Sequence, residues 1–285
     1  MVSSIGFYFG AHQDDALLFR GEFLRSDAST PDARVVHVVT TAGDAGLEAY
    51  WWRAREKGLI DAHGRAHAAD PSGVKRRFGG KNVTVYDAGK WAVYCLRLPD
   101  GNIGGGGFPR TGHASLVKLR DGRINRMQAV DGDAASVYTS WSDFRNTLRA
   151  IVDQEMSAAR LRPPQWVNTA DHLGTNNPND HTDHYATSQA VRDVVGSAYH
   201  RVHWVSYDIE HRPANLADPQ LTWKRDLFYA YAHAVSRDTG TGIGYFDAEW
   251  NRWGNKSYWR EQRATRTTED QPEQPEQQAP EPTAT

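Results

Sequence analysis

Apolar residues follow two alternating patterns along the chain, and these patterns predict two kinds of element. Short runs rich in β-branched and aromatic residues are typical of buried strands, and longer segments with apolar residues at helical spacing are typical of helices. Strands are expected at residues 5–9, 35–41, 83–87, 91–98, 166–169 and 202–207. Helices are expected at residues 50–69, 141–160, 182–199 and 219–235, and another begins near Ala16. The alternation predicts an α/β fold with a mostly parallel sheet that helices cover on both faces.

The length of 285 residues is compatible with one large α/β domain. We expect this single domain to span residues 1–262. The remaining residues, 263–285, are rich in Gln, Pro and Glu, and from Thr265 onward they contain no large apolar side chain. Such a segment cannot bury enough surface to offset the entropy lost on ordering, so a disordered tail is expected there.

The charge balance argues against a polyanionic partner. The chain has 33 Lys and Arg against 35 Asp and Glu, a formal charge of -2, so no overall basic surface is available for nucleic acid or an anionic membrane. A small-molecule substrate is expected instead. Ten tryptophans and an aromatic content of 11% slightly favour a carbohydrate-containing ligand, although most of these rings are expected to pack in the core. The oligomeric state stays open.

Cysteine usage and hydropathy bear on the compartment. The only cysteine, Cys95, lies in an apolar run and is expected to be a buried thiol. No run of 18 apolar residues occurs, and the first residues lack the charged start and apolar stretch of a signal peptide. We therefore expect a cytoplasmic protein without a membrane segment.

Two short segments far apart in the sequence carry the chemistry. His12, Asp14 and Asp15 directly follow the first expected strand, and the segment Asp180-His181-Thr182-Asp183-His184 follows the strand expected at residues 166–169. Because open α/β sheets hold their sites at the carboxyl ends of strands, these two segments can converge.

The residue types of the two segments suit a mononuclear metal site. A catalytic zinc ion usually takes three protein ligands from His, Asp and Glu and leaves a fourth position for water. His12 and Asp15 lie three residues apart and can point the same way, and one histidine of the second segment would complete the set. Asp14 is then left over. A carboxylate beside the water is what a hydrolase uses to take the proton of that water.

Each segment also has a purely structural interpretation. Asp14 and Asp15 could cap the helix that begins near Ala16, since Asp is a favoured N-cap residue. His181 and His184 could be surface histidines one helical turn apart. The order of the two segments, each after an expected strand, favours the metal site over these alternatives.

Three other histidines are not expected to bind a metal. His37 lies within a β-branched strand and is expected in the core. His63 and His67 lie one turn apart in the helix at residues 50–69, but no carboxylate signature surrounds them, so a surface position is expected for both.

The two segments resemble the signatures of a known family. His12-Gln13-Asp14-Asp15 is similar to A/P-H-P-D-D-E, and His181-Thr182-Asp183-His184 is similar to H-x-D-H, the signatures of the PIG-L/LmbE-like metal-dependent N-deacetylases. Further similar segments are Thr41 to Gly46 (T-x-G-E-x-G), Arg53 with Glu56 (R-x-x-E), Leu98-Pro99-Asp100-Gly101, Arg212 to Leu216, and Lys224. The resemblance covers roughly the first 235 residues and implies a Rossmann-like, LmbE-like single domain.

The resemblance also implies a role for each site residue. The metal ligands would be His12, Asp15 and His184, and Asp14 would be the general base. His181 would donate a hydrogen bond or a proton to the tetrahedral intermediate. Asp183 would orient and tune His181 through a bond between its carboxylate and the imidazole. The implied cofactor is Zn²⁺, although two imidazoles and one carboxylate would also accept Fe²⁺, Co²⁺ or Ni²⁺.

The chain departs from the family pattern at three positions. Gln13 replaces the usual proline and Ala16 the usual glutamate, which predicts a less rigid loop without that glutamate's capping role. Asn179 stands where some relatives carry a tyrosine that polarises the substrate carbonyl. The group that stabilises the oxyanion is therefore open, and His181 alone could supply it.

The leading hypothesis is a zinc-dependent hydrolase that removes an N-acetyl group from an amino sugar, such as N-acetylglucosamine, or from a glycosylated small molecule, releasing acetate and a free amine. One alternative is a related amidase that cleaves a larger acyl or amide linkage. Another is a sugar-binding relative without turnover, against which the spare carboxylate of Asp14 argues.

Overall fold

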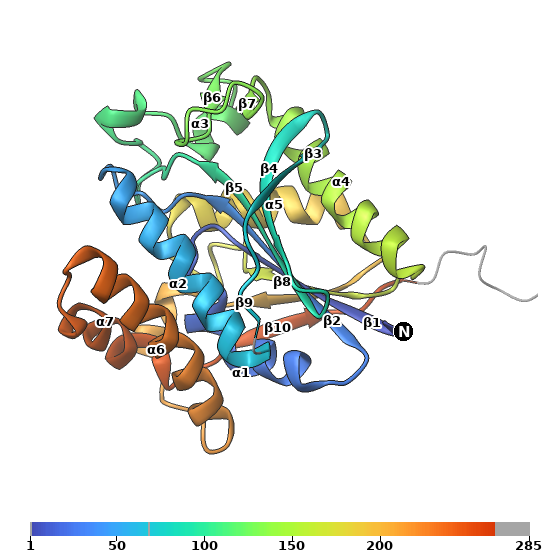
Figure 1. The fold of residues 1–285 in the computed structure, drawn as a ribbon, viewed down its shortest axis with the longest axis vertical. Coiled ribbons are helices and arrows are strands. Elements are labelled where there is room, and N and C mark those ends of the chain that lie inside the picture. The colour runs from blue at the N-terminus through green and yellow to red at the C-terminus, as the bar shows by residue number, and fades with distance from the viewer. Residues whose placement is uncertain (1, 68, 266–285) are drawn as a thin grey trace, which may run out of the picture.

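The computed structural model describes residues 2–67 and 69–265, except for the side chain of His67. A single sheet forms the middle layer, and helices lie on both of its faces (Figure 1). The eight strands of this sheet have the order β10-β9-β8-β1-β2-β5-β4-β3. Their bounds are β1 Ser4–Gly10, β2 Ala33–Thr41, β3 Val74–Phe78, β4 Lys81–Asp87, β5 Trp91–Leu98, β8 Trp166–Ala170, β9 His200–Trp204 and β10 Trp259–Gln262. β6 Met127–Gln128 and β7 Val137–Tyr138 form a separate two-stranded sheet.

The helices divide between the two faces of the sheet. In Figure 1, α2, α6 and α7 lie together on one side of the sheet, and α4 lies on the other. The long helices are α1 Asp15–Ser29, α2 Ala49–His67, α4 Trp141–Ala159, α5 Thr182–Val195 and α6 Gln220–Thr239. The short ones are α3 Leu116–Arg120, α7 Ile243–Glu249, the 3₁₀ helices η1 Pro109–Thr111 and η2 Tyr207–His211, and the π-helical turn η3 Trp250–Gly254. None of the described helices is long and apolar enough to cross a membrane.

Parallel pairing in the middle of the sheet creates the place for a site. β1 pairs in parallel with β2 on one side and with β8 on the other, and β5 and β9 extend the parallel set. The connection after β1 leads to β2, and the connection after β8 leads to β9 on the other side of the sheet, so the two connections diverge from the neighbouring strands β1 and β8. A crevice forms at the carboxyl ends of the strands where the connections diverge in this way, and ligands bind there in open α/β sheets.

Two apolar cores hold the helices against the sheet. Phe144, Ile151 and Val191 of α4 and α5 pack against one face. Leu17 of α1 and Leu227 of α6 pack, with partners from α2, against the other. The strands of the parallel core are buried along almost their whole length because helices cover them on both sides. The α/β fold, its mostly parallel sheet and its helices on both faces are as the sequence predicts.

The individual elements also follow the sequence closely, with two kinds of exception. Every expected strand and helix is present, and Cys95 is buried, as predicted. The surface position expected for His63 is wrong: its side chain is fully buried, and its Nε2 atom lies 3.1 Å from Nδ1 of the core residue His37. The edge strands β3 and β10, the small sheet of β6 and β7, and the short helices α3 and α7 were not predicted. The tail expected at residues 263–285 falls mostly on residues 266–285, which lie outside the described residues.

Candidate metal centre and active site

The turn between β1 and α1 delivers three polar side chains to the crevice. β1 ends at Gly10, and α1 begins at Asp15, so His12 and Asp14 lie in the tight connection between them. A Cβ atom at Gly10 would meet the backbone oxygen of His12 at 2.9 Å and Cβ of Asp15 at 3.3 Å. The close return of the chain therefore needs glycine at this position.

His12, Asp15 and His184 bring one donor atom each to a common point. Nδ1 of His12 lies 3.2 Å from Nε2 of His184 and 3.4 Å from Oδ1 of Asp15, and Nε2 of His184 lies 3.1 Å from the same Oδ1. Ligands on a tetrahedral zinc ion with bonds of 2.0–2.1 Å lie about 3.3 Å apart. The triangle therefore has the size that a zinc ion requires, and all three residues are buried.

The remaining atoms of these three side chains are held so that the donor atoms face inward. Oδ2 of Asp15 accepts hydrogen bonds from the backbone N–H groups of Ala11 (2.8 Å) and His12 (2.9 Å), which leaves Oδ1 for an ion. Nδ1 of His184 lies 2.9 Å from Oδ1 of Asp180, so the proton of the neutral imidazole stays on Nδ1 and Nε2 presents its lone pair. Asn177 in turn donates to Oδ2 of Asp180 (2.6 Å).

The electrostatics of the cluster favour a positive charge at its centre. Burial lowers the pKa of His12, but Asp15, Asp183 and Asp100 outweigh burial and raise it to about 10. Burial raises the pKa of Asp15, but the imidazoles of His184 and His12 outweigh it and hold the pKa well below its usual range. A metal cation would supply the positive charge that these carboxylates stabilise.

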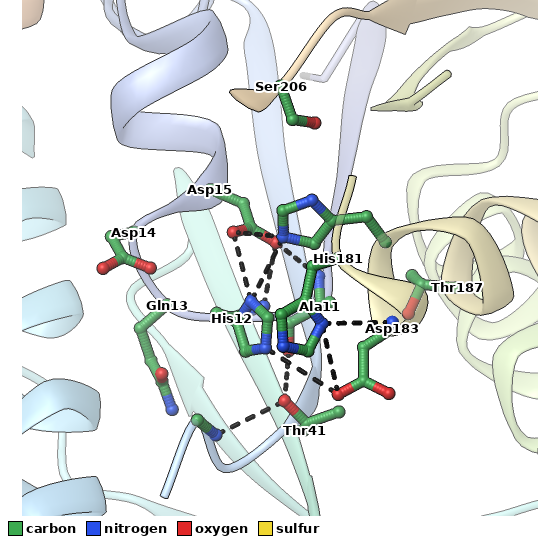
Figure 2. Close-up of polar contacts among 12 residues, drawn as sticks. Ala11, His12, Gln13, Asp14, Asp15, Thr41, His181, Asp183, Thr187 and Ser206 are labelled. Atoms are coloured by element: carbon green, nitrogen blue, oxygen red, sulfur yellow. Dashed lines mark hydrogen bonds and ion pairs between the residues drawn. The ribbon is translucent and has the colours of Figure 1, made fainter. Parts of the chain in front are cut away.

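Asp14 stands beside the cluster and does not cap the helix. It occupies the N-cap position of α1, but its side chain makes no capping hydrogen bond. Instead Oδ1 accepts a hydrogen bond from Nη2 of Arg55 (2.6 Å), and Oδ2 accepts one from the hydroxyl of Tyr231 (3.3 Å). Figure 2 shows the Asp14 carboxylate turned aside from the side chains of His12 and Asp15. The capping interpretation of Asp14 therefore has no support in the geometry.

His181 and Asp183 lie on the other side of His12 (Figure 2). His181 is the N-cap of α5, and its Nδ1 accepts the backbone N–H of Asp183 (3.2 Å), so Nε2 carries the proton. Nε2 faces Oδ1 of Asp100 at 3.6 Å. The Asp183 carboxylate accepts the backbone N–H of Gly101 (2.7 Å) and lies 3.8 Å from both His12 Nε2 and His181 Nδ1. Asp183 therefore bonds to His181 through its backbone amide and not through the expected carboxylate-to-imidazole hydrogen bond, because its carboxylate lies 3.8 Å from both imidazoles.

A cavity of about 120 Å³ opens over the cluster. His12, Asp14, Asp15 and His181 lie at its polar end. Aromatic side chains from the C-terminal part of the chain form much of the remaining wall of the cavity, namely Tyr207, Tyr231, Tyr245, Phe246 and Trp253. Glu249 also lines the cavity, and burial together with the nearby Asp14 raises its pKa to about 8. Asn179 is exposed and has φ of 56°, so it does not take the position of a carbonyl-polarising tyrosine.

Sequence reasoning found the cluster but not the residues that hold Asp14. It singled out Arg53 of the R-x-x-E pattern, whereas the structure uses Arg55, two residues later on the same helix; Arg53 lies over the ring of Trp52 instead. No motif near Tyr231 in the sequence indicates its contact with Asp14. The spacing of Asp180 does indicate its contact with His184, because it lies four residues before His184 and such a spacing brings two side chains together on a helix.

A second group of ligand-type residues, Asp171, His172 and His203, lies away from the cavity. Both carboxylate oxygens of Asp171 already accept hydrogen bonds from Arg260, at 2.7 and 2.8 Å. A cation would have to displace this guanidinium. The group is therefore an ion pair flanked by two imidazoles and offers no free carboxylate to a metal.

Comparison with known proteins agrees with this geometry. The family model described as GlcNAc-PI de-N-acetylase, PIG-L, matches residues 7–195, about two thirds of the chain. The chain belongs to the PIG-L family. The family match supports an enzyme that hydrolyses N-acetyl groups, and the family is generally metal-dependent, for which the buried cluster provides suitable ligands. No curated protein matches the chain.

Solved structures with a partly similar fold include two of a deacetylase from the teicoplanin biosynthetic pathway. A triple mutant has 14% identity and a TM-score of 0.45, with 86% of this chain and 88% of the other covered. A deacetylase–bog complex has 14% identity and a TM-score of 0.46, with 85% and 90% covered. The third is the 4-carboxy-2-hydroxymuconate hydratase of Pseudomonas putida, with 11% identity, a TM-score of 0.43, and 86% and 82% covered.

The PIG-L match stops before the residues that close the cavity. It ends at residue 195, the last residue of α5. Tyr207, Tyr231, Tyr245 and Glu249 all follow it. The matched region therefore contains both signature segments, whereas much of the cavity wall belongs to the part of this PIG-L protein outside the family model.

Proposed function

We propose that this PIG-L protein is a zinc-dependent N-deacetylase that hydrolyses the acetamide of an amino sugar, such as an N-acetylglucosamine unit, or of a glycosylated small molecule. Acetate and a free amine would be the products. The observation that carries the proposal is the position of Asp14. This carboxylate lines the cavity beside a triangle of metal-type ligands and has no capping role.

His12, Asp15 and His184 would hold the zinc ion. When bound, the ion would lower the pKa of a water molecule and polarise the amide carbonyl. The size of the triangle and the fixed outer atoms of Asp15 and His184 support this assignment. Asp180 would keep His184 in the required tautomer.

Asp14 would act first as a base and then as an acid. It would take a proton from the attacking water while the oxygen of that water bonds to the carbonyl carbon. It would then pass the proton to the nitrogen as the carbon–nitrogen bond breaks. Arg55 and Tyr231 hold the Asp14 carboxylate in place for this transfer.

His181 would stabilise the negative charge that develops on the carbonyl oxygen. Its Nδ1 accepts a backbone N–H, so its Nε2–H is the atom available to donate. Asp183 would fix His181 through its backbone amide. Because Asn179 is exposed and is not among the residues that line the cavity, we assign the donor role to His181.

The size of the cavity argues against the alternative of an amidase that cleaves a larger acyl group. A space of about 120 Å³ admits an acetyl-sized group, but it leaves little room for a long acyl chain. The decisive experiment loads the purified protein with zinc and measures amine release from N-acetyl, N-butanoyl and N-octanoyl glucosamine, and from N-acetylated glycosides. Preference for the acetyl substrates supports the proposal. Preference for the octanoyl substrate supports the amidase, and binding without amine release supports a sugar-binding protein.

A further inference from the structure

A second cavity, of about 260 Å³, lies at the opposite end of the sheet from the metal cluster. It is lined by residues from the starts of β1 and β8, among them Ile5, Gly6 and Trp166, and by residues of α1. The metal cluster lies at the carboxyl ends of the same strands. This cavity is therefore separate from the proposed active site.

A break in α1 places one charged side chain against this cavity. Arg20 has φ of −147° and ψ of 17°, values that are not helical, in the middle of the helix. Its side chain lines the cavity and its residue surface is only 3% exposed. The guanidinium carbon lies 3.4 Å from the ring centroid of Phe23 and 4.4 Å from that of Trp259. Two aromatic rings therefore hold the guanidinium in place.

The charge of Arg20 has no ionic partner within the part of the chain that the structure describes. No carboxylate of residues 2–67 or 69–265 forms an ion pair with it within 4.0 Å. Its Nε donates a long hydrogen bond to Oδ1 of Asn168 (3.4 Å), and its buried Nη1 has no hydrogen-bond partner. Burial lowers the pKa of Arg20. Because buried charges are normally paired, this arrangement calls for an anion.

The two carboxyl groups that line the cavity are engaged elsewhere. Asp27 accepts a hydrogen bond from the hydroxyl of Tyr8 (2.7 Å), and burial raises the pKa of Asp27 although Tyr8 and the charge of Arg20 oppose the shift. Glu261 lies 3.1 Å from Nη2 of Arg263 and is exposed. Both groups, and Glu22, raise the pKa of Arg20 from a distance, but none of them lies within the 4.0 Å of an ion pair, so the guanidinium lacks a carboxylate in direct contact.

We propose that this cavity is a binding site for a small organic monocarboxylate with an apolar body, whose carboxylate pairs with Arg20. The single guanidinium provides for one negative charge and not for the two of a phosphate monoester. Apolar side chains that include Ile5, Ala33 and Val202 line the cavity beside Phe23 and Trp166, so they would cover the body of the ligand.

The test uses benzoate as the probe and benzamide, its neutral analogue of the same shape, as the matched control. The expected result on the full chain is a saturable rise in Tm with benzoate, a much smaller rise with acetate or phosphate, and none with benzamide. Equal effects of benzoate and benzamide would overturn the proposal, as would a stronger effect of phosphate. The titration is repeated on His184→Ala, which lacks a metal ligand, and the benzoate effect must persist there.

Variants of α1 separate binding from folding. Arg20→Met should abolish the benzoate effect, and its Tm without ligand should equal or exceed that of the parent, because an unpaired buried charge has been removed. Arg25→Met, on the same helix outside the cavity, should keep the full benzoate effect. Benzoate binding by Arg20→Met would refute the site. If Arg20→Met does not fold, Trp166→Phe and Trp259→Phe decide, because benzoate must change tryptophan fluorescence in the parent and less in each of these variants.

Discussion

At the residue scale, the most consequential feature is the contrast between two adjacent aspartates. Asp15 turns toward the imidazoles of His12 and His184, and Asp14 turns toward Arg55 and Tyr231. The backbone turn after β1 separates them, since Asp15 already belongs to α1 whereas Asp14 precedes it. Two adjacent residues therefore have different proposed roles: Asp15 binds the metal ion, and Asp14 takes a proton from the water.

Replacing Asp14 by Asn tests its proposed task as a base. Asp14→Asn keeps the shape of the side chain but removes its basic oxygen, so kcat should fall by ~10²–10⁴, the usual size of general-base catalysis. Zinc content and Tm should change little. The comparison is kcat at equal metal occupancy, with the exposed Asp121→Asn as the control. An Asp14→Asn protein that turns over like the parent would leave the mechanism without its base.

Asp180 offers a graded test of the metal site. Asp180→Asn removes the carboxylate that orients His184, so zinc affinity should fall by roughly 10- to 100-fold, whereas His184→Ala should lose the ion entirely. Competition with a zinc chelator measures both. Asp208→Asn, a carboxylate on η2 that pairs with Arg212, is the matched control. Unchanged affinity in Asp180→Asn and stoichiometric zinc in His184→Ala would remove both residues from the proposed site.

The sequence was sufficient for the residues of the cluster and insufficient for those that surround it. His12, Asp15, His181 and His184 lie in short signatures, so local spacing revealed them. Tyr231 reaches Asp14 across 217 positions, and only the packing of α6 against α1 and α2 brings it there. No motif or residue spacing in the sequence predicts a contact that only tertiary packing creates.

At the scale of elements, burial explains which strands could be predicted. The parallel strands are buried on both faces and appear as continuous apolar runs. β3, at the edge of the sheet, has four exposed residues out of five and reads Val-Lys-Arg-Arg-Phe, and β10 at the other edge is short and polar. Charged, exposed edge strands lack an alternation of apolar and polar residues, so the sequence pattern did not predict them.

A buried ion pair ties α4 to the sheet and gives a stability prediction. Nε and Nη2 of Arg34 donate to the two carboxylate oxygens of Glu155 at 2.7 and 2.8 Å, and the Tyr94 hydroxyl donates to the same carboxylate. Arg34→Met leaves Glu155 buried without its cation, which should cost about 3–5 kcal/mol. In the double variant with Glu155→Leu, part of this loss should be recovered, because Glu155 no longer carries an unpaired charge whereas Asp87 and the Tyr94 hydroxyl still lack their partners. Urea unfolding measures both, and a double variant less stable than Arg34→Met would refute the pairing argument.

At the scale of the whole molecule, buried histidines should limit stability in acid. Burial lowers the pKa of His37 and of His203 to about 4, from an ordinary value of 6.5. Between these values the unfolded chain binds protons that the folded chain does not, so stability is lost as pH falls from about 6.5 to 4. The slope of unfolding free energy against pH reports the number of protons taken up on unfolding. This number should fall by about one in His37→Gln and by about one in His203→Gln. It should not change for the exposed His211→Gln. Parallel slopes in all four proteins would contradict this account.

The pairing of β1 with β8 has a consequence for how the molecule matures. Two proposed ligands follow β1 and the third lies beyond β8, so the complete triplet does not exist until chain segments more than 150 residues apart have become neighbours. Contacts between such distant segments form slowly, because a long loop must close first. A nascent or refolding chain would therefore present only two ligands and hold zinc weakly. Tight zinc binding would therefore occur only once folding is complete. The bound ion would then stabilise the native state relative to the partly folded states.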